Sequence, residues 1–294
     1  MIQLSSKPLS TQAADGLKNL QNNVDGKAIY IEQVAEAIRL WGNKPNTTFS
    51  AVKKALIDLT ISVQTCNYCE NNEATDIEHI YPKSHFPSRC FDWNNYILAC
   101  GKCNTHEKSD DFAIFDPTDS NNLVELKRYK PEERIQPTTD DGALISPRTE
   151  DPMTYLWLSL EPIGQRLIFV PKEIDKTTRH YVRADYTINL LNLNRDQLAI
   201  ARFQAANYFI SRLKLYAHVK SATNFDELEA ATDDFKPINT AISFIDEQQN
   251  ILNSIKTDIL HYPHPTVWAE LKRQRDKLPK TNALFQSVPE ALTW

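Results

Sequence analysis

Residues 66–109, CNYCENNEATDIEHIYPKSHFPSRCFDWNNYILACGKCNTHEKS, are the part of the chain whose fold the sequence specifies most directly. A CxxC pair stands at each end of this stretch, and thirty residues separate the two pairs. A tight CxxC turn directs two thiolates at one ion, and two such turns complete a closed tetrahedral site. The sequence therefore predicts a structural Zn²⁺, which would also supply folding free energy to a stretch with few aliphatic residues. Its ligands would be Cys66, Cys69, Cys100 and Cys103.

A redox pair of the thioredoxin type is the alternative explanation for a CxxC motif. It would account for one pair and not for two, and no β–α–β pattern surrounds either pair. Cys90 is the remaining cysteine, and we expect it to be a small buried or surface thiol and not a metal ligand.

The composition sets limits on function. The chain has 294 residues, a formal net charge of -5 and a hydrophobic content of 41%, enough for two domains or one large one. Proteins that bind nucleic acid unaided usually carry a basic surplus, which this chain lacks. Either its basic residues gather on one face, or a partner supplies much of the binding to nucleic acid.

Sequence features of membrane insertion and of nucleotide binding are missing. There is no run of 18 apolar residues, so no membrane span is expected. The first ten residues, MIQLSSKPLS, lack the basic and apolar regions of a signal peptide, which predicts a cytoplasmic location. Nothing reads GxxxxGK[ST] or GxGxxG, so any nucleotide hydrolysis would require another subunit.

The pattern of apolar residues predicts an α+β fold that is mostly helical. We expect a helical N-terminal region (1–64), a compact core rich in Cys and His (65–112), a loop-rich connector with short strands (113–182) and a helical C-terminal region (183–294).

Several elements follow from this pattern. One N-terminal helix would bury Val34, Ala35, Ile38 and Trp41, and a second would run from 49 to 63. In the connector, 115–122 and 130–142 are predicted loops, and 143–146 and 166–170 are strand candidates. Asn194 or Asp196 would cap a helix that reaches Ala217, with Arg195 and Arg202 expected as solvated surface residues; further helices are expected over 238–260 and 266–277.

Three segments of the core resemble HNH endonucleases: DIEHIYPKS (76–84), WNNYIL (93–98) and CNTHEKS (103–109). The pattern of that family is a strand carrying acid-His-Ile-x-Pro, a central Asn, and a short helix that begins at CxxCN with a Lys nearby. The resemblance covers about 45 residues and implies a ββα-metal core. It further implies a metal-dependent endonuclease that hydrolyses phosphodiester bonds in nucleic acid, with DNA favoured and RNA as the alternative.

Each role is implied by the position that a residue matches. His79 would be the general base, since an unperturbed pKa of ~6.5 leaves imidazole largely neutral near neutral pH. Asn95 would steady the loop and the orientation of His79. Glu78 and Asn104 would bind a catalytic Mg²⁺ or Mn²⁺, a hard ion that prefers oxygen ligands. Because strand neighbours point to opposite faces, the backbone must bend for Glu78 and His79 to serve one site.

Other residues of the core have less definite roles. Asp76 would be an extra metal ligand, and His106 competes with Asn104 as the second ligand or contacts substrate. Three lysines are candidates for phosphate contacts, with solvated surface residues as the alternative, namely Lys83, Lys102 and Lys108. His85 is expected to be a bystander or a substrate contact.

A second resemblance lies in RADYTINLLNLNRDQLAIAR (183–202). This stretch is similar to the segment after the HNH core in the nuclease subunits of Septu-type and retron-linked antiphage systems. In those systems the nuclease works with an ABC/SMC-like ATPase, so the resemblance implies antiviral defence and an ATPase partner. An ordinary capped helix explains the same residues.

Two other functions compete with a DNA nuclease. A non-catalytic, zinc-stabilised adaptor would recruit an ATPase or nucleic acid and would need the cysteines but not His79. A toxin-like RNA nuclease would use the same site, since chemistry at the phosphate does not itself select DNA.

Overall fold

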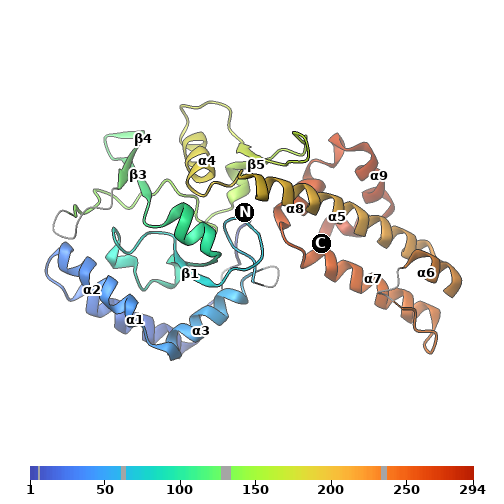
Figure 1. The fold of residues 1–294 in the computed structure, drawn as a ribbon, viewed down its shortest axis with the longest axis horizontal. Coiled ribbons are helices and arrows are strands. Elements are labelled where there is room, and N and C mark those ends of the chain that lie inside the picture. Colours follow the sequence, from blue (N-terminus) through green and yellow to red (C-terminus); the bar gives the residue numbers. More distant parts are fainter. Residues whose placement is uncertain (6, 61–63, 127–133, 233–236) are drawn as a thin grey trace. The chain divides into compact units, whose positions relative to one another are not determined.

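A computed structural model describes the chain except for residues 6, 61–63, 127–133 and 233–236. Backbone contacts divide it into two compact units. The first comprises Met1–Ser159 and Ile168–Leu198, and the second comprises Leu160–Leu167 and Ala199–Trp294. Helices dominate and the sheets are small (Figure 1), so the predicted α+β class is confirmed. The four regions expected from the sequence stay a prediction at the level of domains.

Three helices open the first unit: α1 (Thr11–Asp25), α2 (Tyr30–Gly42) and α3 (Asn46–Ile57). Helix α1 lies in the predicted helical N-terminal region, although the sequence analysis did not name it as a separate helix, and it packs against both of the others (Figure 1). The buried face of α2 is Val34 and Ala37, whereas Ala35 and Ile38 are exposed. The expected face was therefore right at Val34 and wrong at Ala35 and Ile38. The predicted second helix corresponds to α3, which ends at Ile57, and its expected end at Val63 lies outside the described residues.

The centre of this unit is an antiparallel pair of short strands followed by a helix. Strand β1 (Asp76–His79) pairs with β2 (Tyr96–Ala99), so that Glu78 faces Ile97 and His79 faces Tyr96. The turn that contains the second CxxC pair leads from β2 into η3 (Lys102–Lys108), a wide helix of the π type. Two 3₁₀ turns, η1 (Pro87–Arg89) and η2 (Trp93–Asn95), lie in the loop between the strands. This is the β–β–α arrangement that the sequence predicts.

The predicted loop at 115–122 is in fact part of a hairpin. Strand β3 (Phe112–Asp116) pairs with β4 (Asp119–Leu126), and the Asp116 carboxylate accepts hydrogen bonds from the backbone N–H and hydroxyl of Thr118. This local capping stabilises a tight turn, so a segment rich in Asp, Asn and Thr still forms strands. The loop prediction for 115–122 was therefore wrong.

The two strand candidates of the connector had different outcomes. Residues 143–146 form no strand, although the Ala143 N–H donates to the Ala113 carbonyl at 2.9 Å. The candidate at 166–170 overlaps β6 (Phe169–Pro171), which pairs with β5 (Leu156–Leu158). A 3₁₀ turn, η5 (Pro152–Thr154), precedes β5, and α4 (Arg179–Leu190) follows β6.

Helix α5 (Asp196–Ser221) contributes most of its length to the second unit. Its buried side chains include Ala205, Phe209 and Leu213, as expected. Asn194 does not cap it, because the amide of Asn194 bonds both backbone polar groups of Phe169. Arg202 is 1% exposed, so its prediction as a surface residue was wrong.

The remaining helices complete the second unit. Helix α7 begins at Phe244, because Ser243 accepts a hydrogen bond from the Asp246 N–H and caps it; the expected start at 238 was too early. The other elements are α6 (Phe225–Ala231), α7 (Phe244–Leu260), α8 (Pro265–Arg273), η6 (Arg275–Lys277), α9 (Pro279–Ser287) and η7 (Pro289–Thr293). At the C-terminus, the Trp294 ring contacts those of Tyr216 and Trp268. No helix in the described part of the chain has the length and apolar character needed to cross a membrane.

Candidate metal centre and catalytic pocket

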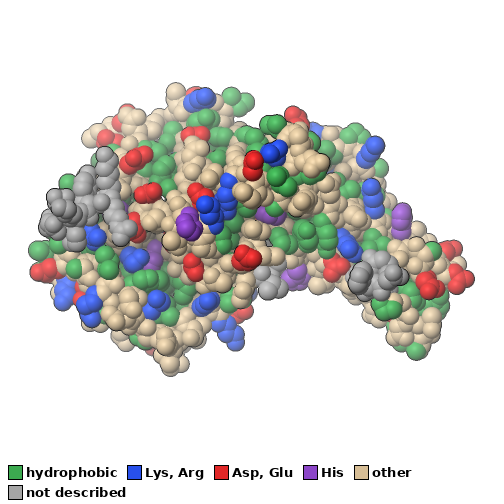
Figure 2. Space-filling view, viewed as in Figure 1, with side chains coloured by type: hydrophobic (Ala, Val, Ile, Leu, Met, Phe, Trp, Pro, Cys, Tyr) green, Lys and Arg blue, Asp and Glu red, His purple; other side chains and the backbone are tan. Residues whose placement is uncertain are grey.

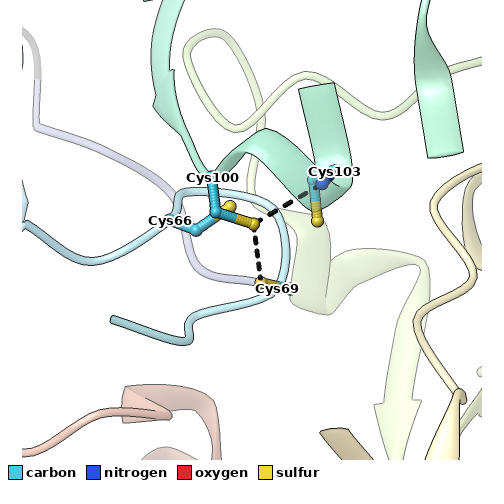
Figure 3. A group of neighbouring side chains, drawn as sticks. All are labelled: Cys66, Cys69, Cys100 and Cys103. Carbon is cyan, nitrogen blue, oxygen red and sulfur yellow. Dashed lines mark hydrogen bonds between the residues drawn. The ribbon is translucent and has the colours of Figure 1, made fainter. Parts of the chain in front are cut away.

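The four cysteines of the two CxxC pairs converge on one point. Their sulfur atoms all lie within 4.8 Å of one another and all four residues are buried (Figure 3). Cys69 Sγ and Cys100 Sγ are 3.8 Å apart. A tetrahedral zinc with bonds of about 2.3 Å requires sulfur–sulfur distances of about 3.8 Å, so the cluster fits Zn²⁺.

Backbone hydrogen bonds fix both turns of the knuckle. The Glu70 N–H donates to the Cys66 carbonyl at 2.8 Å, and the Cys103 N–H donates to Cys100 Sγ at 3.5 Å. The Asn67 side chain joins the first turn to β2, since its Oδ1 accepts from the Leu98 N–H at 2.9 Å. These bonds fix the shape of the two turns that carry the cysteines.

Arg195 lies against the cysteine cluster and not on the solvated surface that the sequence analysis expected. Its guanidinium is 3.7 Å from Cys103 Sγ and also donates to the carbonyls of Leu191 and Asn192 at 3.2 Å each. A centre of four thiolates and one Zn²⁺ carries two net negative charges, so a cation beside it is favourable.

His79 ends strand β1 with its ring oriented by neighbours. Its Nε2 is 2.9 Å from the Cys90 carbonyl oxygen, and its ring centroid is 4.2 Å from that of Trp41. A carbonyl can only accept, so Nε2 carries the hydrogen and Nδ1 keeps the lone pair. Burial, and then the positive charge of Lys83, lower the pKa of His79 well below its usual value. The imidazole is therefore a neutral base with a fixed tautomer.

Glu78 and Lys108 form a buried ion pair beside this histidine. Lys108 Nζ is 2.7 Å from Glu78 Oε1 and donates to the His79 carbonyl at 2.9 Å. Burial raises the pKa of the Glu78 carboxyl, and Lys108 opposes that rise. Because Lys108 is fully buried, the structure gives no support to its predicted phosphate contact.

Asn104 and Asp76 are joined across the start of η3. Asn104 Nδ2 donates to Asp76 Oδ2 at 3.0 Å, which leaves the amide oxygen of Asn104 for another partner. Asn104 also lines a hollow of about 180 Å³ together with Glu78 and His79. Three residues that the sequence grouped as one site therefore share one cavity.

Asn95 lies behind this cavity and secures the loop between the strands. Its Oδ1 accepts from the Tyr81 N–H at 2.7 Å, and its Nδ2 donates to the carbonyls of Tyr81 and Arg89 at 3.0 and 2.8 Å. These bonds hold the two ends of the loop that presents Cys90 to His79. These bonds place Asn95 where it can steady the loop, and Asn95 does not line the hollow.

The other candidates are divided between the cavity and the surface. Lys83 lines the hollow, as does Asp110, which the sequence analysis did not single out. His106 and Lys102 are exposed and do not line it, and Lys102 Nζ lies 3.3 Å from Glu107 Oε1. His85 is buried in the interior, next to a separate hollow.

Trp41 is a second residue near this site, besides Asp110, whose role sequence reasoning missed. It comes from α2, outside the cysteine-rich core, and its indole packs on the ring of His79. The sequence identified Trp41 only as part of an apolar helix face. Nothing local in the sequence indicates that this face would meet a histidine 38 positions later.

Within the described residues, the cysteine cluster is the one group of three or more His, Cys, Asp or Glu side chains arranged to hold an ion. A second cation in the hollow would be bound by few protein groups, namely carboxylate and amide oxygens completed by water. This donor set suits Mg²⁺ or Mn²⁺, which keep several water ligands.

Comparison with known families agrees with this geometry. Residues 66–110 match the family model described as HNH endonuclease. The matched stretch contains both CxxC pairs, both strands, and His79, Asn95 and Asn104. No curated protein matches the chain. Residues 66–110 therefore carry a domain that matches the HNH endonuclease family, which implies metal-dependent nuclease activity, and the match includes neither helical flank.

Proposed function

We propose that this protein is an HNH endonuclease that hydrolyses phosphodiester bonds of nucleic acid, with DNA as the favoured substrate. The observation that carries the proposal is the shared hollow: Glu78, His79 and Asn104 line the same cavity of about 180 Å³. A neutral base and oxygen ligands for a cation at one cavity are what hydrolysis of a phosphodiester requires.

In this mechanism His79 accepts a proton from the attacking water through Nδ1, while the Cys90 carbonyl holds Nε2–H. The new bond forms between the water oxygen and phosphorus, and the bond to the 3′ oxygen breaks, which leaves 5′-phosphate and 3′-hydroxyl ends. Glu78, through the oxygen that Lys108 does not take, and Asn104 Oδ1 would hold Mg²⁺ or Mn²⁺. When bound, such an ion supplies charge stabilisation for the leaving oxygen.

The zinc centre has a structural role in this proposal. Four thiolates would close the coordination of its ion, so it offers no open position for water or phosphate. Cleavage should therefore depend on added Mg²⁺ or Mn²⁺ even when zinc is fully bound.

The central test is cleavage of supercoiled plasmid and of labelled RNA by His79→Ala and Asn104→Ala variants in Mg²⁺. Both should lose activity by at least about a hundredfold, as expected for loss of a general base or a metal ligand. Zinc content should stay unchanged. The control is His218→Ala, which removes an exposed histidine from α5. Wild-type rates in the His79→Ala variant would refute the proposal.

A zinc-stabilised adaptor without catalysis is the second candidate. The Glu78–Lys108 ion pair supports it, because a neutralised carboxylate is a weaker cation ligand. This candidate predicts that Glu78→Gln, His79→Ala and Asn104→Ala have no phenotype, whereas Cys66→Ser and Cys100→Ser do. The same set of variants therefore separates the two functions.

We further propose a cytoplasmic role in antiviral defence, with an ABC/SMC-like ATPase partner as in Septu-type or retron-linked systems. Support comes from the resemblance of residues 183–202, the acidic net charge and the lack of a phosphate-binding glycine loop. Purification of the tagged chain with its genomic neighbours tests this proposal. Recovery of no ATPase would contradict it, and preferential cleavage of RNA would favour a toxin-like nuclease.

A further inference from the structure

A second hollow lies beside the catalytic cavity, toward the N-terminal helices. It has a volume of about 410 Å³ and is lined by residues of α2, α3 and β1. Asn104 lines both hollows, and Asp76 of β1 lines the second. The two hollows therefore share Asn104, one of the residues proposed to hold the catalytic cation. The lining residues 41–53 precede the matched HNH stretch.

Trp41 lines the second hollow. Its ring packs on His79, and the Nζ atoms of Lys44 and Lys83 lie 4.7 and 5.8 Å from its ring centroid. Lys44 lines the second hollow, whereas Lys83 lines the first. One lysine from the lining of each hollow thus lies close to the same indole, which packs on His79.

The lining of the second hollow contains cationic and neutral hydrogen-bonding side chains of the kinds that bind phosphate. Lys53 joins Lys44 in its lining, and within the described part of the chain neither lysine has a carboxylate partner. Asn46 and Ser50 add neutral hydrogen-bonding groups, and Asn46 begins α3, whose N-terminal end bears partial positive charge. The one acidic residue of the lining, Asp76, already accepts a hydrogen bond from Asn104.

We propose that this hollow binds the sugar–phosphate backbone of the substrate strand next to the scissile phosphate, with Lys44 and Lys53 contacting phosphates. The inference rests on the proposed function, because one strand would pass from this hollow into the catalytic cavity past Asn104. A local pair of lysines also explains how a chain with a net charge of -5 would bind a polyanion. On the face that Figure 2 shows, Lys and Arg side chains lie along α2 and α3.

The test measures binding separately from cleavage. The full-length Lys44→Gln/Lys53→Gln variant is compared with Lys18→Gln/Lys54→Gln, which removes two exposed lysines of α1 and α3 that line neither hollow. Fluorescence anisotropy with a labelled DNA duplex is recorded without Mg²⁺ over a range of salt concentrations. Circular dichroism and zinc content establish that both variants fold.

Loss of two phosphate contacts should lower the slope of log Kd against log salt by about 2 and weaken binding about tenfold or more at low salt. The control should follow the wild type. Lys44→Arg/Lys53→Arg, which keeps both charges, should restore affinity. In Mg²⁺ the Gln variant should show a raised KM with kcat within about threefold of wild type, since these contacts bind ground and transition states alike.

Equal salt slopes for the two Gln variants would overturn the inference, even if the wild type cleaves DNA. Polyglutamate that binds the wild type while DNA does not would also overturn it, because the hollow would then fit an acidic protein. If instead DNA binds with the expected slopes but Mg²⁺ produces no cleavage, the backbone site is supported and the proposed nuclease function fails.

Discussion

Lys108 Nζ lies 2.7 Å from Glu78 Oε1, and both side chains are almost entirely removed from solvent. One ammonium group thus neutralises the carboxylate proposed as a metal ligand and, through its bond to the His79 carbonyl, ties η3 to the end of β1. Lys108 therefore acts as a positioning residue for the acid–histidine pair.

Removal of the Lys108 ammonium group should destabilise the fold. We expect Lys108→Met to lower the free energy of unfolding by about 3–5 kcal/mol, because it leaves a buried carboxylate without its partner. Lys102→Met, in the same helix but exposed, should cost less than about 1 kcal/mol. Urea unfolding of both variants at pH 7 measures the difference. Equal stabilities would mean that the ion pair contributes nothing to the fold.

The cysteine cluster should account for all the zinc in the protein. We expect Cys100→Ser to lose bound zinc and to expose residues 66–110 to proteolysis, because metal binding supplies folding free energy to this stretch. Cys90→Ala is the matched control, since Cys90 is also buried but its thiol is not part of the cluster. It should retain one zinc per chain by elemental analysis. Loss of zinc from Cys90→Ala would show that the ligand set is wrong.

The parts of the site that the sequence predicted are those set by short-range spacing. Each CxxC turn brings two thiolates together within four residues, and the β1–β2 pair follows from the motif between them. Glu78, His79 and Asn104 could be grouped because the family pattern carries their positions. The contacts of these residues could not be predicted from the pattern. Lys108 was expected at the surface, because burial of its charge depends on Glu78, a partner thirty residues away.

Errors elsewhere have similar causes. The β3–β4 hairpin was missed because its turn and second strand are rich in Asp and Asn, which usually indicate loops. Arg202 was assigned to the surface because no sequence period reveals a buried arginine. Helix α1 begins with a serine cap and a modest apolar face, and it becomes recognisable only when α2 and α3 cover it. For Arg202 and α1, tertiary packing decided what local preference left open, whereas the hairpin depends on the local capping by Asp116.

Glu150 gives the fold a defined dependence on pH. Its carboxylate accepts from Arg183 at 2.7 Å, from the Tyr155 hydroxyl at 2.8 Å and from the Ser146 N–H at 3.0 Å. Burial alone would raise the pKa of Glu150, but the bonds from Arg183 and Ser146 outweigh burial and lower it. A carboxyl with a lowered pKa binds fewer protons in the folded state, so its stabilisation is present at neutral pH and lost as pH falls below about 4.3.

Glu150→Gln should therefore lower the free energy of unfolding by about 1.5–3 kcal/mol at pH 7, which is the range for hydrogen bonds to a charged group. The difference from wild type should stay nearly constant from pH 7 to about 5 and shrink as pH falls below about 4.3, because only the wild type then loses the charge. Urea unfolding across this range measures both curves, and acid loss of zinc affects them equally. A difference that stays constant with pH would show that the Glu150 charge does not stabilise the fold.

Arg195 should slow the release of zinc. Its guanidinium lies 3.7 Å from Cys103 Sγ and is fixed by two carbonyls, so it offsets the negative charge of a thiolate centre. Outer partners of metal ligands typically contribute 10–100-fold in affinity. We expect Arg195→Gln to raise the rate of zinc transfer to a chromogenic chelator about tenfold or more, while Arg195→Lys restores part of the loss. Arg212→Gln, from helix α5, which begins directly after Arg195, is the control, because Arg212 is remote in sequence from the cysteines. A release rate for Arg195→Gln equal to that of this control would rule out the role.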